Sequence, residues 1–148
     1  MRDRCRILCA ALLAAFSAAP TYAADRQYRG EFDPFPHDMS TRDNVVGIGR
    51  VSADLAGYEL TIHGDFSGLS SPATGAQLRM GLAMGVPGES VGTLTVTKAE
   101  NGQLSGTVRL TAAGLKALDR NALYIELDSA NAPNGNSWAW LETQAGMS

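Results

Sequence analysis

The sequence predicts an all-β protein, an antiparallel β-sandwich with one short helix. Much of the chain consists of short segments in which apolar and polar residues alternate, the period of two that suits strands with one buried face. Turn signals rich in glycine, proline and asparagine separate these segments at intervals of about eight to twelve residues. One segment alone carries the apolar spacing and the capping residue of a helix.

Residues 1–23 have the pattern of a cleavable export signal. Three arginines stand among the first six residues, residues 7–19 form an apolar run, and small residues precede Ala24, where a signal peptidase would cut. The run is too short to span a bilayer comfortably. We therefore expect an exported protein, periplasmic or secreted, with no stable membrane insertion after cleavage.

The mature chain is expected to be one domain over residues 24–148. Both cysteines, Cys5 and Cys9, lie in the signal, so no disulfide can brace the domain and a hydrophobic core must stabilise it. The net charge is −3, and the signal carries three of the twelve basic residues but one of the fifteen acidic ones. Its removal makes the protein more acidic, which argues against a nucleic-acid or anionic-membrane partner.

The first two strands are expected at about residues 28–32 and 45–53. The sequence Pro34-Phe35-Pro36 breaks the first, and Gly47 and Gly49 indicate a bulge or a close neighbour in the second.

A hairpin over residues 58–83 comes next, and the rest of the chain is organised around it. Its two alternating strands flank a polar turn at residues 68–72. The residues expected on the shared buried face are Tyr58, Leu60, Ile62, Ala76, Leu78, Met80 and Leu82.

Four more elements follow a loop at residues 83–90. Strands are expected at 93–97 and 103–110, joined by a turn at Asn101-Gly102, with Leu104, Val108 and Leu110 on one face. Thr111 can cap a helix over residues 111–120, in which Leu115 and Leu118 lie on one side. Two last strands are expected at 123–128 and 137–142.

Three stretches resemble the CHRD domain family, β-domains named from chordin and found in many microbial secreted proteins. They are FSGLSSPATGA at residues 66–76, LSGT and LTAA between residues 104 and 113, and LYI at residues 123–125 ahead of a Pro-Asn-Gly turn. The resemblance covers roughly residues 47–141. It implies a sandwich of immunoglobulin-like or superoxide-dismutase-like architecture that acts by binding, as in chordin-like proteins, where such domains sit in assemblies that engage protein ligands.

At three positions the resemblance bears on a metal site. CHRD-like sequences commonly carry His-x-His after the Ser-Pro-Ala-Thr turn, where this chain has Gln77 and Arg79, and a further histidine where it has Asp128. Without these imidazoles a copper or zinc site loses its ligands, so no metal and no cofactor is expected. The remaining histidines, His37 in a loop and His63 on a polar strand face, are expected at the surface.

No catalytic constellation is evident in the sequence. Ser67 lies outside a Gly-x-Ser-x-Gly elbow, and the mature chain has no cysteine nucleophile and no phosphate-binding glycine loop. Glu59, Glu126 and Asp128 are expected on polar strand faces, where carboxylates are usually solvated.

Trp138 and Trp140 share a face of the last strand, and core packing and a contact surface both fit them. The residues expected to contact a partner, if there is such a surface, are Trp138, Trp140, Gln77, Arg79 and Asp128. The sequence thus favours an exported, non-enzymatic binding module whose partner is an unknown protein or small ligand. The alternatives are a periplasmic metal-binding or enzyme-accessory protein with a superoxide-dismutase-like sandwich, and a small-ligand or glycan binder that uses the tryptophan strand.

Overall fold

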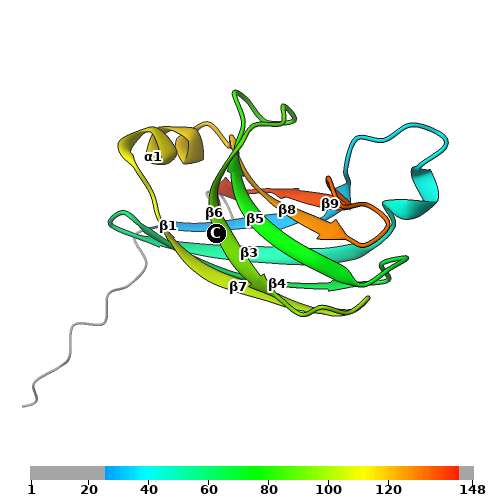
Figure 1. Ribbon diagram of the computed structural model, residues 1–148. Coiled ribbons are helices and arrows are strands. Elements are labelled where there is room, and N and C mark those ends of the chain that lie inside the picture. The colour runs from blue at the N-terminus through cyan, green and yellow to red at the C-terminus, as the bar shows by residue number, and fades with distance from the viewer. Residues whose placement is uncertain (1–25, 144–148) are drawn as a thin grey trace, which may run out of the picture.

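The computed structural model describes residues 26–143, which form ten strands and two short helices (Figure 1). The expected signal, its cleavage site and both cysteines lie outside the described residues. The elements are β1 Arg26–Glu31, β2 Asp33–Pro34, the 3-10 helix η1 Arg42–Asn44, β3 Ile48–Ala56, β4 Glu59–Ser67, β5 Ala73–Met80, β6 Glu89–Val96, β7 Gly102–Arg109, α1 Ala112–Asp119, β8 Leu123–Ser129, β9 Ser137–Trp140 and β10 Glu142–Thr143. No helix in this part of the chain is long and apolar enough to cross a membrane.

The strands belong to one antiparallel sheet, in the order β10-β1-β3-β4-β7-β6-β5-β8-β9-β2. The sheet curls so that β5, β8 and β9 form one layer over β1, β3, β4 and β7 (Figure 1). Strand β6 joins the layers, because Thr95 and Val96 pair with β7 while its earlier residues pair with β5. The all-β prediction with one short helix is confirmed, and the two layers are parts of a single curled sheet.

The two ends of the sheet meet at a seam. Strand β10 pairs with β1, and β2 pairs with β9. Both pairs have the same antiparallel register, so the segment that holds β1 and β2 runs alongside the segment that holds β9 and β10. Gly30 lies where these segments cross, and a Cβ there would stand 2.5 Å from the carbonyl oxygen of Trp140. A residue without a side chain therefore lets the seam close.

The core fills the space between the layers. The side chains predicted to face the core do so. The exposed fraction is 0% for Leu60, Ile62 and Leu78 and 4% for Leu110. Because successive side chains of a strand point to opposite faces, the same alternation fixes which residues point outward.

Two members of the expected buried face are exposed, and both lie beyond the end of a strand. Tyr58 is 49% exposed because β4 begins at Glu59, and Tyr58 follows Gly57, whose φ of +62° makes the β3–β4 turn. Leu82 is 83% exposed because β5 ends at Met80. The strand predicted at residues 45–53 is β3, which runs from Ile48 to Ala56 and so begins and ends three residues later than predicted.

The helix forms as the sequence predicts. The Thr111 side chain accepts a hydrogen bond of 3.2 Å from the Gly114 amide, which satisfies one of the free N–H groups of the first turn. Leu118 is buried, whereas Leu115 is partly buried against the core.

Candidate functional site

The outer surface of β5, β8 and β9 gathers the outward side chains of three neighbouring strands. We call it the β8 face. Its members are Gln77 and Arg79 of β5, Tyr124, Glu126 and Asp128 of β8, and Trp138 and Trp140 of β9. The strand register aligns them in rows across the sheet, one of Gln77, Glu126 and Trp138 and one of Arg79, Tyr124 and Trp140. All five residues predicted as possible partner contacts therefore lie on one surface.

The β8 face is more buried than the sequence predicts. Glu126 is 6% exposed and Asp128 is 7% exposed, so the prediction that these carboxylates are solvated is wrong, whereas Glu59 is exposed as predicted. Strand β8 is flanked on both sides, by β5 and β9, and the neighbours of Glu126 include the long side chains of Arg79 and Trp138. A charged group in such a place needs a partner, because burial removes its hydration.

Arg79 supplies that partner for Glu126. Its Nε lies 3.4 Å from Oε2 of Glu126 on the neighbouring strand. The same guanidinium donates through Nη1 to Oε1 of Gln77 at 3.2 Å. Nε and Nη2 also donate to the carbonyl oxygen of Gly88, at 3.0 and 2.7 Å. Arg79 therefore joins β8 to the loop between β5 and β6.

Asp128 has no such counterion. Burial raises its pKa from the ordinary 3.8 to about 7, and the hydrogen bond and the negative charge of Glu126 act in the same direction, against the charge of Arg79. Oδ1 of Asp128 is buried and has no hydrogen-bond partner among the described residues. Gly75 lies directly across from it on β5 and brings no side chain to it. Two carboxyl groups thus face one guanidinium, an arrangement in which a shared proton balances the charge.

Four aromatic rings pack beside the carboxyl pair. Trp138 contacts the rings of Phe35, Tyr124 and Trp140 at centroid distances of 4.9, 5.7 and 5.2 Å, and Tyr124 and Trp140 are 4.4 Å apart. Trp140 is buried and Trp138 is half-buried. Both lie on the outer face of the sheet and not in the core between the layers. They pack against other aromatic rings of that outer face.

The loop at residues 81–88 closes one side of the β8 face. The Gly88 amide donates to the Tyr124 hydroxyl at 3.0 Å, beside the bonds from Arg79 to the Gly88 carbonyl. At the other end of the loop, a Cβ on Gly81 would stand 3.2 Å from the Trp140 ring. No pattern in the sequence points to Gly88 or Phe35, because their contacts join segments that are distant in the chain.

Neither histidine is a member of the β8 face. His63 is exposed on the outer face of the β3–β4–β7 layer, and His37 is exposed with Nδ1 2.8 Å from the Phe35 carbonyl oxygen. Residues 26–143 contain no group of three or more histidine, cysteine, aspartate or glutamate side chains placed to hold a metal ion.

The opposite layer has a polar outer surface. It carries an open hollow of about 810 Å³ whose lining includes Arg50, Ser52, His63, Asp65 and Ser105. Arg50 is 3.9 Å from Glu31 and is paired across the sheet with Asp65, so its charge is balanced locally. This surface lacks the aromatic cluster that distinguishes the β8 face.

No curated protein and no solved structure matches the chain. A family model does match, the one described as the CHRD domain, over residues 32–136. The match spans β2 to β8 and ends just before β9, so it includes most of the sheet and the β5 and β8 residues of the β8 face. The chain belongs to the CHRD domain family.

Proposed function

We propose that this protein is an exported, non-enzymatic binding module of CHRD type that engages a protein partner through the β8 face and the two apolar segments beside it. The observation that carries the proposal is the distribution of exposed apolar side chains. Five of the seven large ones among the described residues lie on two segments that contact β8 or β9. These are Leu82, Met84 and Val86 on one segment, and Met39 and Val46 on the other. The other two, Ile48 and Tyr58, belong to the side of β3 and β4.

Both segments are attached to this side of the molecule. Residues 81–88 are bonded to Arg79 and Tyr124. Residues 35–46 touch the same side through the Phe35–Trp138 ring contact and a 3.0 Å bond from Asn136 to the Val46 carbonyl. Figure 1 shows the two segments rising on the side of the β5–β8–β9 layer. Exposed apolar groups on both sides of a half-buried tryptophan are typical of protein-binding surfaces.

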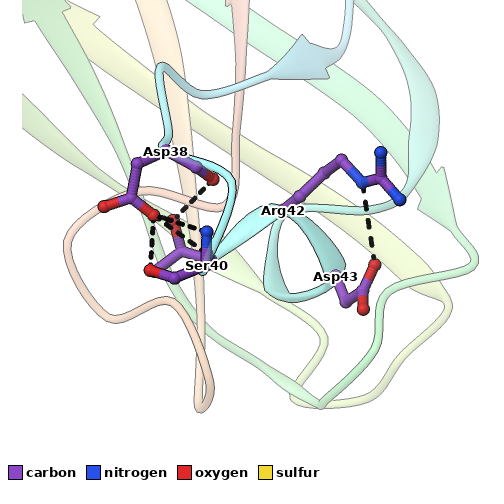
Figure 2. A network of polar contacts seen from close by, with 5 residues as sticks. Asp38, Ser40, Arg42 and Asp43 are labelled. Carbon is purple, nitrogen blue, oxygen red and sulfur yellow. Dashed lines mark hydrogen bonds and ion pairs between the residues drawn. The ribbon is translucent and has the colours of Figure 1, made fainter.

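The second segment has a defined local structure. Asp38 Oδ1 accepts bonds from the Ser40 amide and hydroxyl at 2.9 and 2.6 Å and from the Thr41 amide at 3.1 Å (Figure 2). These bonds lower the pKa of Asp38, those from Ser40 most. The turn holds Met39, which is 84% exposed, at a fixed place, and a preorganised contact costs less entropy on binding.

A non-enzymatic role is consistent with the carboxyl pair. Glu126 is already engaged by Arg79, and both carboxyl side chains are buried, so neither is open to a substrate as an acid or base would need to be.

Export is part of the proposal and rests on the signal pattern at residues 1–23 together with the family. Mass spectrometry of protein recovered from the periplasm or the medium should find an N-terminus at Ala24. Recovery of a chain that retains Met1 would contradict export by cleavage.

The binding surface is tested by affinity capture from the exported fraction of the native cells, followed by titration of the captured partner. Leu82→Ser and Met84→Ser remove apolar groups from the first segment, and His63→Ala and Thr95→Ala are matched changes on the opposite surface. We expect the first pair to lose the partner and the second pair to retain it. Equal binding by all four variants would reject the β8 face as the binding surface.

Small-ligand binding is a second candidate because a hollow of about 530 Å³ lies beside the tryptophan strand. Its lining includes Met84 and Trp140 as well as Arg29, Glu31 and Glu142, an apolar wall with polar groups around it. This is the size of many ligand sites. Titration with a glycan and metabolite panel, read by tryptophan fluorescence, tests it, and a response that persists in Met84→Ser would place the ligand elsewhere.

A further inference from the structure

We propose that the carboxyl pair of Glu126 and Asp128 is a proton-dependent switch for the 81–88 loop, which is docked while the pair holds one proton and released when the pair holds none. This inference concerns the regulation of the proposed binding surface and rests on that function for its biological meaning. It is argued from the contacts among β5, β8 and the loop.

The first step is the charge balance of the cluster. With one proton on the pair, Asp128 can donate to Glu126, and the single negative charge that remains is matched by Arg79, 3.4 Å from Glu126. Loss of the proton puts a second negative charge on Asp128, whose buried Oδ1 has no partner among the described residues. An unpaired buried charge is unfavourable, so the cluster must change its contacts.

The second step is that Arg79 is the movable member of the cluster. The same guanidinium contacts Glu126, Gln77 and the Gly88 carbonyl, so any shift toward Asp128 lengthens its two bonds to Gly88. A neutral carbonyl binds a guanidinium less strongly than a second carboxylate does. Ionised Asp128 therefore draws Arg79 away from the loop.

The third step is that few other contacts hold the Gly88 end of the loop. Met80 and Glu89 pair at the base of the loop, and the β5–β6 ladder shifts register one pair further in, between Leu78 and Arg79. The Gly81 amide donates to the Ala122 carbonyl at 2.8 Å and ties the start of the loop to the segment before β8. Beyond it, the Val86 amide bonds the Ala83 carbonyl within the loop at 3.0 Å, and the Tyr124 hydroxyl accepts from the Gly88 amide. Leu82 is 83% and Met84 is 49% exposed, so these apolar side chains bury little surface that would anchor the loop.

The neighbourhood of the pair contains few other groups that titrate. Strand β5 contributes Arg79 and β8 contributes Tyr124, while the described part of β9 presents two tryptophans and no titratable side chain. At the edges, Asp33 of β2 lies opposite Trp138 and Glu89 follows the loop. His37 belongs to the segment that contacts Trp138, so it is the group to control for.

Burial and Glu126 raise the pKa of Asp128 to about 7, which places the change within a range that an exported protein can meet. Docking is favoured on the acidic side of this value and release on the alkaline side. The contact between the loop and the β8 face, and with it the presentation of Leu82 and Met84, then depends on pH.

The test is the mobility of a nitroxide spin label at position 84 in the chain from Ala24 onward, which contains no cysteine until Met84→Cys is introduced. Spectra are recorded from pH 5 to pH 9. We expect the mobile component to increase with a midpoint near pH 7, and a label at position 107 on the opposite layer to show no change. A position-84 spectrum that is constant over this range overturns the proposal.

Three variants identify the group that titrates. In Asp128→Asn, which mimics the protonated side chain, the loop should stay docked at every pH, and in His37→Gln it should behave as in the parent chain. Should Asp128→Asn fail to fold, Glu126→Gln serves instead, and its midpoint should fall by at least one pH unit because the second negative charge is gone. An unshifted midpoint in Asp128→Asn or in Glu126→Gln, or its loss in His37→Gln, overturns the assignment.

These measurements need no partner. A failed capture experiment would reject the proposed function and leave the switch standing, whereas a pH-independent spectrum would reject the switch and leave the binding surface standing.

Discussion

Replacing Asp128 by asparagine should change how the stability of the protein depends on pH. In the folded protein the pKa of Asp128 is raised from 3.8 to about 7, chiefly by burial. In the unfolded chain the side chain ionises near its ordinary value, so between these two values the folded state holds a proton that the unfolded state has lost. The contribution of Asp128 to stability is therefore fully present below about pH 4, falls as the pH rises toward 7, and is constant above that.

The size of the effect follows from the width of this window. Each pH unit within it corresponds to about 1.4 kcal/mol per proton, so the full loss approaches about 4 kcal/mol. This is an upper bound, since entry of water or movement of Arg79 would relieve part of the cost of the buried charge. Asparagine does not ionise, and its amide can still donate to Glu126. The free energy of unfolding of the variant, relative to the parent, should rise between pH 4 and pH 7 and then level off.

Urea unfolding followed by tryptophan fluorescence at several pH values measures this difference. Asp65→Asn is the matched control, because Asp65 is exposed on the opposite layer, and its difference from the parent should vary by less than about 0.5 kcal/mol across the range. A difference for Asp128→Asn that does not depend on pH would refute the account of the carboxyl pair.

Three further predictions concern the core, the exposed turn and metal binding. Leu78→Ala should cost about 2–5 kcal/mol in urea unfolding, because Leu78 is fully buried, whereas Thr61→Ala on the outer face should cost well under 1 kcal/mol, and equal costs would mean that the strand register is wrong. Asp38→Ala should speed amide hydrogen exchange at Ser40, whose amide donates to Asp38, and unchanged exchange there would show that the turn does not depend on that carboxylate. Elemental analysis of the purified protein should find no stoichiometric copper or zinc, and neither metal should raise the melting temperature; one tightly held ion per chain, lost in His63→Ala, would contradict this.

The orientation of strand residues could be predicted from the sequence because it depends on a local rule. Leu60, Ile62 and Leu78 alternate with polar residues, and in a strand that alternation alone decides which side chains face the core. The rule does not show where a strand ends. Tyr58 and Leu82 continue the alternation past the last paired residue, and the turn at Gly57 and the end of β5 at Met80 place them in solvent.

The burial of Glu126 and Asp128 could not be predicted, because it depends on the order of the strands. The alternation in their sequence shows that both side chains point away from the core. It does not show which strands lie on either side of them and how far the side chains of those strands bury them. Strand β8 lies between β5 and β9, partners that come from residues 73–80 and 137–140. The same holds for the aromatic cluster, in which Phe35 reaches Trp138 from a segment about a hundred residues earlier in the chain.

Gln77, Arg79 and Asp128 stand at the three positions where CHRD-like sequences commonly carry histidine. In this chain they belong to one polar cluster on the β8 face. Arg79 brings a permanent positive charge to the β8 face, and at 4 Å a unit charge repels another by about 4 kcal/mol at an effective dielectric constant of 20, or about twice that for a dication. The guanidinium is the cation that pairs with Glu126, and it neutralises one carboxylate only. Among residues 26–143 no second cation is paired with Asp128, and burial raises its pKa to about 7, which favours the protonated side chain. Because Arg79 also holds Gly88, the switch that we propose couples the proton of Asp128 to the loop that carries Leu82 and Met84.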